Sequence, residues 1–125
     1  MMSVMATSPG PSTVDASAVA RLAHLLADDT RAAMCLALLD GRAWTAGELG
    51  RVAGVSPSTA TGHLNQLVQG GLLAEERQGR HRYLTLAGPA AADLVEDLAG
   101  RARAALTVTS GSLRAVSASH ALAEA

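Results

Sequence analysis

Two short segments of helical periodicity follow each other in the middle of the chain, separated by a glycine turn. Thr45-Ala-Gly-Glu48 has the pattern of a capping box, in which the threonine oxygen accepts a backbone amide and the glutamate reaches back. The helix after it is predicted to bury Leu49 and Val52 and to end at Gly54, since glycine readily adopts the positive φ of a tight turn. Ser56-Pro57 then begins a second helix, with serine as the N-cap. Two helices joined this tightly must pack across each other.

A change of period follows the second helix. This helix is expected to bury Ala60, Leu64 and Leu67, to cross the first helix closely at Gly50, and to stop at Gly70-Gly71. Residues 72–77 and 80–86 then have the pattern of two strands around a Gln78-Gly79 turn, which predicts a β-hairpin. Two short helices followed by a hairpin give the order of a winged helix-turn-helix, a mainly α fold with a small β-hairpin.

Further helices are expected on both sides of this unit. A first helix is predicted over residues 15–27, a second one runs to Leu39 before Gly41, and a last helix runs from Pro89 to Leu106. The residues of the second helix expected to face the core are Ala33, Leu36, Ala37 and Leu39. Thr107–Gly111 is expected to break the last helix. The predicted organisation is therefore a disordered tail (1–14), a winged helix-turn-helix domain (15–106) and a C-terminal tail or weak helix (107–125).

Composition narrows the class of protein. The chain has one Trp, one Tyr and no Phe, so a core of Leu, Val and Ala in closely packed helices is expected. A single cysteine excludes an intrachain disulfide and Cys-rich zinc motifs, and it favours a reducing, cytoplasmic setting. Residues 1–13 lack the pattern of a signal peptide, and no long apolar run predicts a membrane span.

The distribution of charge favours a nucleic-acid partner. The net charge is −1, but residues 42–82 carry five arginines against three glutamates. The helix from Ser56 presents small polar side chains that could reach base edges or phosphates, and the hairpin carries Arg77, Arg80 and Arg82. Double-stranded DNA is therefore the expected partner.

Four stretches carry a resemblance to a known family: Leu25-Leu-Ala-Asp-Asp-Thr-Arg31, Ser56-Pro-Ser-Thr-Ala-Thr-Gly-His-Leu64 with Leu67, Gly71-Leu-Leu, and Gly79-Arg-His-Arg-Tyr83. Across residues 20–100 the chain resembles the ArsR/SmtB family of bacterial repressors. The resemblance implies a homodimer built from the first and last helices, which binds a pseudo-palindromic operator and releases it on sensing a signal. The expected DNA-binding residues are Ser56, Ser58, Thr59, Thr61, His63, Gln66, Arg77, Arg80 and Arg82, and the expected dimer residues are Leu22, Leu25, Leu94, Val95 and Leu98.

The chain departs from the family at the usual metal sites. Many members carry Cys-x-Cys where this chain has Trp44-Thr-Ala-Gly-Glu48, and others use Asp/His and His/Glu pairs where it has Asp93, Glu96 and Asp97 but no histidine. We therefore expect neither a metal nor a cofactor. A small-molecule effector, a partner protein, a redox change or no signal at all remain open as the inducer.

Several residues admit two interpretations. Cys35 is interpreted as a buried, inert thiol rather than a redox sensor, and Trp44 as an anchor between helices rather than a ligand platform. His63 is interpreted as a DNA contact rather than a packing residue, and the hairpin arginines as phosphate contacts rather than protection of an edge strand. The acids Asp93, Glu96 and Asp97 are expected to form a solvated helix face.

No enzyme motif is present, because the sequence contains no Gly-x-Ser-x-Gly elbow, phosphate loop or metalloprotease helix. The rival class is a winged-helix module that binds protein and not DNA, which the low net charge and the absence of lysine favour. The operator sequence and the sign of regulation are not encoded in any recognisable pattern.

Overall fold

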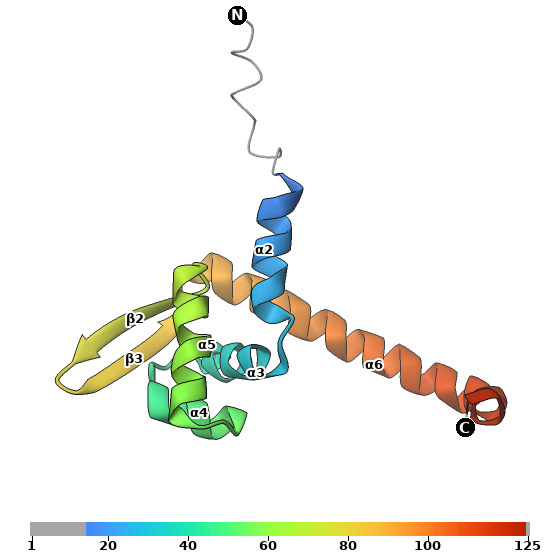
Figure 1. Cartoon of the computed structure of the whole chain (residues 1–125). Helices are drawn as coiled ribbons and strands as arrows, with labels where there is room; N and C mark the ends of the chain where they lie inside the picture. The colour runs from blue at the N-terminus through green and yellow to red at the C-terminus, as the bar shows by residue number, and fades with distance from the viewer. Residues whose placement is uncertain (1–14, 125) are drawn as a thin grey trace, which may run out of the picture.

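The computed structural model describes the backbone of residues 15–124 and the side chains of residues 15–106. The expected tail of residues 1–14 lies outside the described part. In chain order the elements are α2 (Ala16–Leu26), α3 (Asp29–Ala37), the 3₁₀ turn η1 (Leu38–Asp40), β1 (Trp44–Thr45), α4 (Ala46–Ala53), α5 (Pro57–Gln69), β2 (Leu73–Gln78), β3 (His81–Leu86) and α6 (Pro89–Glu124). Figure 1 shows the β2–β3 hairpin and the far part of α6 projecting from opposite sides of the helical body.

The helix-turn-helix forms for the reasons that its sequence indicates. The capping box of α4 is complete, since the Glu48 amide donates to Thr45 Oγ1 at 3.1 Å and the Thr45 amide donates to Glu48 Oε1 at 2.9 Å. Gly54 ends α4 with φ 72°, and Ser56 caps α5 by accepting the Thr59 amide at 3.2 Å. Both helix starts and the turn are confirmed.

The crossing of α4 and α5 depends on a missing side chain. A Cβ on Gly50 would lie 3.1 Å from the Ala60 Cβ, which is tighter than nine in ten such contacts. Glycine therefore lets the two helices approach closely, as expected from the sequence.

The sheet has one strand more than the expected hairpin. Its order is β1-β3-β2, with Trp44 opposite Leu84 in the antiparallel β1–β3 pair. Two residues are too short to show a period, so β1 could not be recognised from the pattern. The hairpin turn consists of Gly79 and Arg80, one residue later than expected, because Gln78 pairs with His81 and Gly79 adopts φ 60°.

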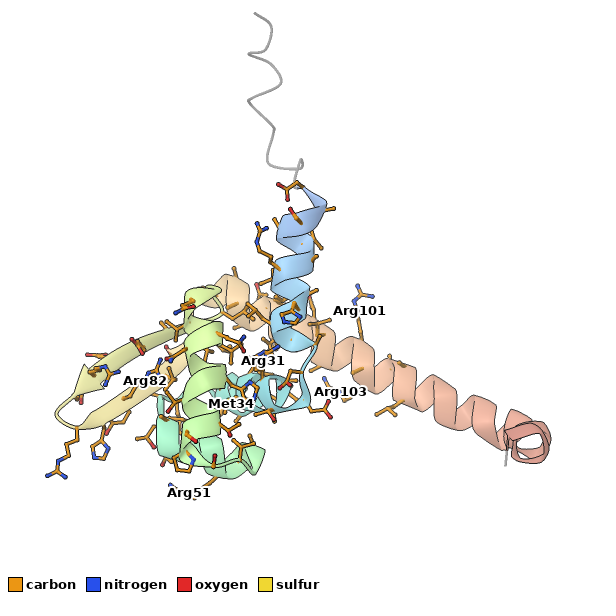
Figure 2. The ribbon with its side chains drawn as sticks, in the orientation of Figure 1. Arg31, Met34, Arg51, Arg82, Arg101 and Arg103 are labelled. Carbon is orange, nitrogen blue, oxygen red and sulfur yellow. The ribbon has the colours of Figure 1, made fainter. Side chains whose placement is uncertain are left out.

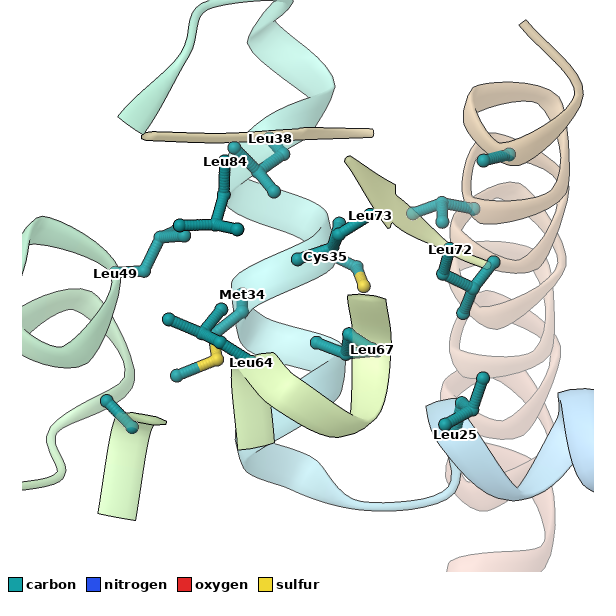
Figure 3. Close-up of a cluster of buried hydrophobic side chains, with 13 residues drawn as sticks. Leu25, Met34, Cys35, Leu38, Leu49, Leu64, Leu67, Leu72, Leu73 and Leu84 are labelled. Atoms are coloured by element: carbon teal, nitrogen blue, oxygen red, sulfur yellow. The ribbon is translucent and has the colours of Figure 1, made fainter. Parts of the chain in front are cut away.

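The core is built mostly of leucine, with Met34 and Cys35 at its centre (Figure 3). The predicted inward residues of α5, Ala60, Leu64 and Leu67, are buried. The expected inward face of the second helix is right for Ala37 and Leu39, which pack against the core, and wrong for Leu36, which is about half exposed. The centre of the buried face is instead formed by Met34 and Cys35 of α3. Val52 of α4 is likewise exposed although it was expected inside, and the buried residues of this helix are Leu49 and Gly50.

Helix α6 is longer than its sequence suggests. It begins at Pro89 as expected, but it continues through residues 107–111 to Glu124, so the expected break is wrong. Threonine, serine and glycine lower helix propensity by about 1 kcal/mol or less each, and only proline removes a helical hydrogen bond outright. Within the described part of the chain, no helix is both long enough and apolar enough to cross a membrane.

Candidate nucleic-acid interface

The exposed face of α5 carries a row of hydroxyl groups whose orientations are fixed. The Ser56 hydroxyl donates to Thr59 Oγ1 at 3.0 Å, and the Thr61 hydroxyl donates to the Pro57 carbonyl at 3.0 Å. Ser58, Thr59 and Thr61 are all exposed. Because each hydroxyl oxygen has two lone pairs, these groups retain the capacity to accept hydrogen bonds from a partner.

Arg31 holds the C-terminal half of α5 against the first two helices (Figure 2). It is only 6% exposed, and its side chain joins α3 to two other helices, α2 and α5. Nε donates to the Leu25 carbonyl at 2.8 Å, Nη2 donates to the His24 carbonyl at 3.0 Å, and Nη1 donates to Gln66 Oε1 at 2.7 Å. We call this set the Arg31 staple. Its role was missed from the sequence, although Arg31 lies within one of the stretches that carry the family resemblance.

The staple changes the interpretation of two expected DNA contacts, His63 and Gln66. Nδ1 of His63 lies 3.2 Å from Arg31 Nη1, and its side chain is only 20% exposed. A guanidinium can only donate, so Nδ1 is the acceptor in this contact, and it also lies 3.9 Å from Asp28 Oδ2. The interpretation of His63 as a packing residue therefore has a structural basis. Gln66 already uses its side-chain oxygen to accept a hydrogen bond from Arg31.

The hairpin presents its arginines in two different states. Arg82 is partly buried, and its Nε donates to Glu75 Oε1. Arg77 and Arg80 are exposed and have neither a hydrogen bond nor an ion pair to any described residue. Arg77 lies directly opposite Arg82 in the β2–β3 register, and like charges in that relation destabilise a sheet.

A groove with a volume of about 440 Å³ lies between the hairpin and the helix-turn-helix. Its lining residues are Thr45, Ala46, Gly47, Arg51, Thr61, Arg77, Arg80, His81 and Arg82. It contains four arginines and no carboxylate. Arg51 was not among the residues expected from the sequence.

The expected dimer residues divide into two groups. Leu25 and Val95 are buried in the core of the protomer itself, so their side chains are already used. Leu22 and Leu98 are 39% and 45% exposed, and Leu94 is partly buried. Beside Leu98 lies a small apolar groove between α3 and α6, lined by Leu26, Ala32, Leu36, Val95, Leu98, Ala99 and Ala102.

The structure distinguishes between the two interpretations of Cys35 and between the two interpretations of Trp44. Cys35 is fully buried, and burial raises the pKa of its thiol to about 11, as the inert interpretation requires. Trp44 lies in β1, where its Nε1 donates to the Asp40 carboxylate at 3.1 Å and the Arg42 guanidinium stacks 4.7 Å above its ring. The tryptophan thus anchors the turn before α4 rather than joining two helices.

The acidic face of α6 is exposed at Asp93, Glu96 and Asp97. Among the residues that the structure describes, no group of three or more His, Cys, Asp or Glu side chains is placed to hold a metal ion.

Comparisons with known proteins agree with this geometry. Residues 26–76 match the family described as helix-turn-helix domain. The HTH-type transcriptional regulator YdfF of Bacillus subtilis is 44% identical over 80 residues, which cover 64% of this chain and 35% of that protein. The chain thus matches about a third of the length of this relative.

Solved structures share the fold. One is the winged helix-turn-helix DNA-binding domain Mb0332 from Mycobacterium bovis, which is described as homodimeric and as a possible ArsR-family transcriptional regulator. Its TM-score is 0.67 and its sequence identity is 25%; the match covers 77% of this chain and 93% of the Mb0332 chain. The transcriptional repressor BigR from Xylella fastidiosa has a TM-score of 0.59 and 26% identity, covering 66% and 84%. The chain therefore carries a helix-turn-helix domain, in the winged-helix fold that it shares with Mb0332, the possible ArsR-family regulator.

Proposed function

We propose that this protein is a sequence-specific, DNA-binding transcriptional regulator that binds a pseudo-palindromic operator as a homodimer. The observation that carries the proposal is the exposed face of α5, where oriented hydroxyls stand beside a hairpin with two unpaired arginines. A helix in this position fits the major groove, and the hairpin then lies along the adjacent backbone or minor groove.

The roles of the side chains follow from their geometry. Ser58, Thr59 and Thr61 are short and polar, so they can approach base edges without burying a charge. Arg77 and Arg80 contact phosphates, which adds affinity for every sequence. His63 reaches DNA only through its Nε2 edge, since Arg31 lies against Nδ1.

Dimerisation through α2 and α6 supplies the two-fold symmetry of the operator. The exposed Leu22 and Leu98 are the members of the expected interface that remain available to a second copy. The sign of regulation is proposed as repression, because BigR is named as a repressor. The signal that releases the DNA is left open, and a regulator of this kind acts in the cytoplasm.

The test is selection of bound sequences from random duplex DNA, followed by fluorescence anisotropy at several salt concentrations. We expect enrichment of a site with two related halves and an affinity that falls steeply with added salt, because bound phosphates release counterions. Arg80→Ala should weaken binding to all duplexes, whereas Thr59→Ala should reduce the preference for the selected site. If the wild-type protein binds no duplex at low salt, the rival protein-binding module is the better account.

A further inference from the structure

The groove between the hairpin and the helix-turn-helix combines features that call for an anion. Its arginines come from distant parts of the sequence, Arg51 from α4 and Arg77, Arg80 and Arg82 from the hairpin. Figure 2 shows Arg51 at the foot of α4 and Arg82 on the hairpin. Concentrating four positive charges in one groove is unfavourable unless an opposite charge compensates.

Little compensation comes from the protein itself. Glu75 binds Arg82, but within the described residues Arg51, Arg77 and Arg80 have no carboxylate within 4 Å. The pKa of Glu48 is lowered first by the hydrogen bond from the Thr45 amide and least by the charge of Arg51, so this carboxylate offsets Arg51 only weakly. Arg77 also faces Arg82 across the hairpin, which adds repulsion that a bound anion would relieve.

The position of Arg51 is set by its own helix. An ideal Cβ on Gly47 would lie 3.7 Å from Arg51 Nη1, so the guanidinium folds back over the glycine one turn earlier. Because Gly47 has no side chain, nothing from this residue stands between the Arg51 guanidinium and the groove. Thr61 of α5, whose hydroxyl oxygen is free to accept but whose proton is given to Pro57, lines the opposite part.

We infer that this groove is a phosphate clasp, in which Arg51 and the hairpin arginines together hold one backbone phosphate of duplex DNA. This inference rests on the proposed function and adds Arg51 to the interface. With α5 in the major groove, one of the bordering phosphate strands passes between Thr61 and the hairpin, where the groove lies. Planar guanidinium groups bind phosphate oxygens in pairs, which suits a site made of arginine alone.

The test compares Arg51→Ala and Arg101→Ala, with Arg51→Lys as a conservative variant. Arg101 is an exposed arginine on α6, away from the hairpin (Figure 2), so its removal changes the net charge equally without touching the groove. Anisotropy with a selected duplex is measured from low to high salt. Arg51→Ala should lower affinity about 10-fold, as loss of one hydrogen bond to a charged group does. It should also make the slope of log K against log salt less negative by about 0.9, the value for one phosphate. Arg51→Lys should recover most of the slope but less of the affinity. Arg101 lies on the helix proposed for dimerisation, so the variants are compared at a concentration at which sedimentation velocity shows each to be a dimer; there Arg101→Ala should match the wild type.

A second arm identifies the phosphate and its source. A series of duplexes is used, each with one backbone phosphate replaced by a neutral methylphosphonate. At one position the replacement should lower the affinity of the wild type but cause no additional loss in Arg51→Ala, which already lacks that phosphate contact. Inorganic phosphate, added at constant ionic strength, should compete only weakly; strong competition would point to a free anion as the occupant and overturn the clasp.

Failure of the clasp can be told apart from failure of the proposed function. If the wild type binds duplex DNA and Arg51→Ala keeps both its affinity and its salt slope, the clasp is wrong and the regulator remains. If the wild type binds no duplex, both are wrong.

Discussion

Replacing Arg31 by methionine tests whether the staple holds the DNA-binding helix in place. Arg31→Met keeps a side chain of similar length in a buried position but removes every donor. The Leu25 carbonyl at the end of α2 and the Gln66 side chain then lose this partner, and the His24 carbonyl keeps only the hydrogen bond from the Ala27 amide. His63 loses its contact with Arg31 and keeps only Asp28, 3.9 Å from its Nδ1.

The magnitude follows from the hydrogen bonds. Bonds to a charged group contribute about 1.5–3 kcal/mol each, and two of these end on main-chain carbonyls that cannot turn away. Partial rehydration of the less buried carbonyl reduces the sum, so we expect a loss of about 3–5 kcal/mol in the free energy of unfolding. A domain of this kind has roughly 5–15 kcal/mol in total, so the variant would be marginal.

The assay is urea unfolding followed by circular dichroism, at one fixed protein concentration because dimerisation adds to apparent stability. Arg21→Met, at an exposed arginine of α2, is the matched control and should change stability by about 0.5 kcal/mol or less. Arg31→Lys should be intermediate, since one ammonium cannot span the acceptors on both α2 and α5. A loss below about 1 kcal/mol for Arg31→Met would refute the staple as a determinant of the fold.

Three further predictions concern acid stability, the thiol and the dimer. Asp28 caps α3 by accepting the Arg31 amide, and this hydrogen bond is the main reason why the pKa of Asp28 lies below 3.8. The ionised carboxylate therefore stabilises the fold above pH 3.8, and this contribution is lost as the pH falls through the lowered pKa. Asp28→Asn should flatten the curve of unfolding free energy against pH in this acid range, and an unchanged curve would contradict the prediction. Cys35 should not react with a thiol reagent at pH 8 until urea unfolds the protein, because its pKa is about 11, and rapid modification of the native protein would show the burial to be wrong. In sedimentation velocity we expect monomers for Leu22→Asp and for Leu98→Asp. The control Val52→Asp changes an exposed apolar residue of α4 and should remain a dimer. If all three variants remain dimers, the interface lies elsewhere.

The local signals of the sequence were sufficient for most of the secondary structure. The capping box at Thr45, the N-cap at Ser56 and the positive-φ turn at Gly54 each depend on residues within one turn of a helix, and all three formed as expected. The buried face of α5 also followed from its period. The errors on α3 and α6 have different origins. A short apolar helix such as α3 offers two plausible inward faces, whereas α6 continues because weak helix formers do not by themselves end a helix.

By itself, then, the sequence determined the order of the elements and the exposed hydroxyl face of α5, because caps, turns and periods act between near neighbours. Only the tertiary structure decided that Arg31 engages His63 and Gln66, that Leu25 and Val95 belong to the protomer core, and that Arg51 joins the hairpin arginines in one groove. These contacts join residues about 25 or more positions apart, and which of them meet depends on how the helices pack, which no local pattern encodes.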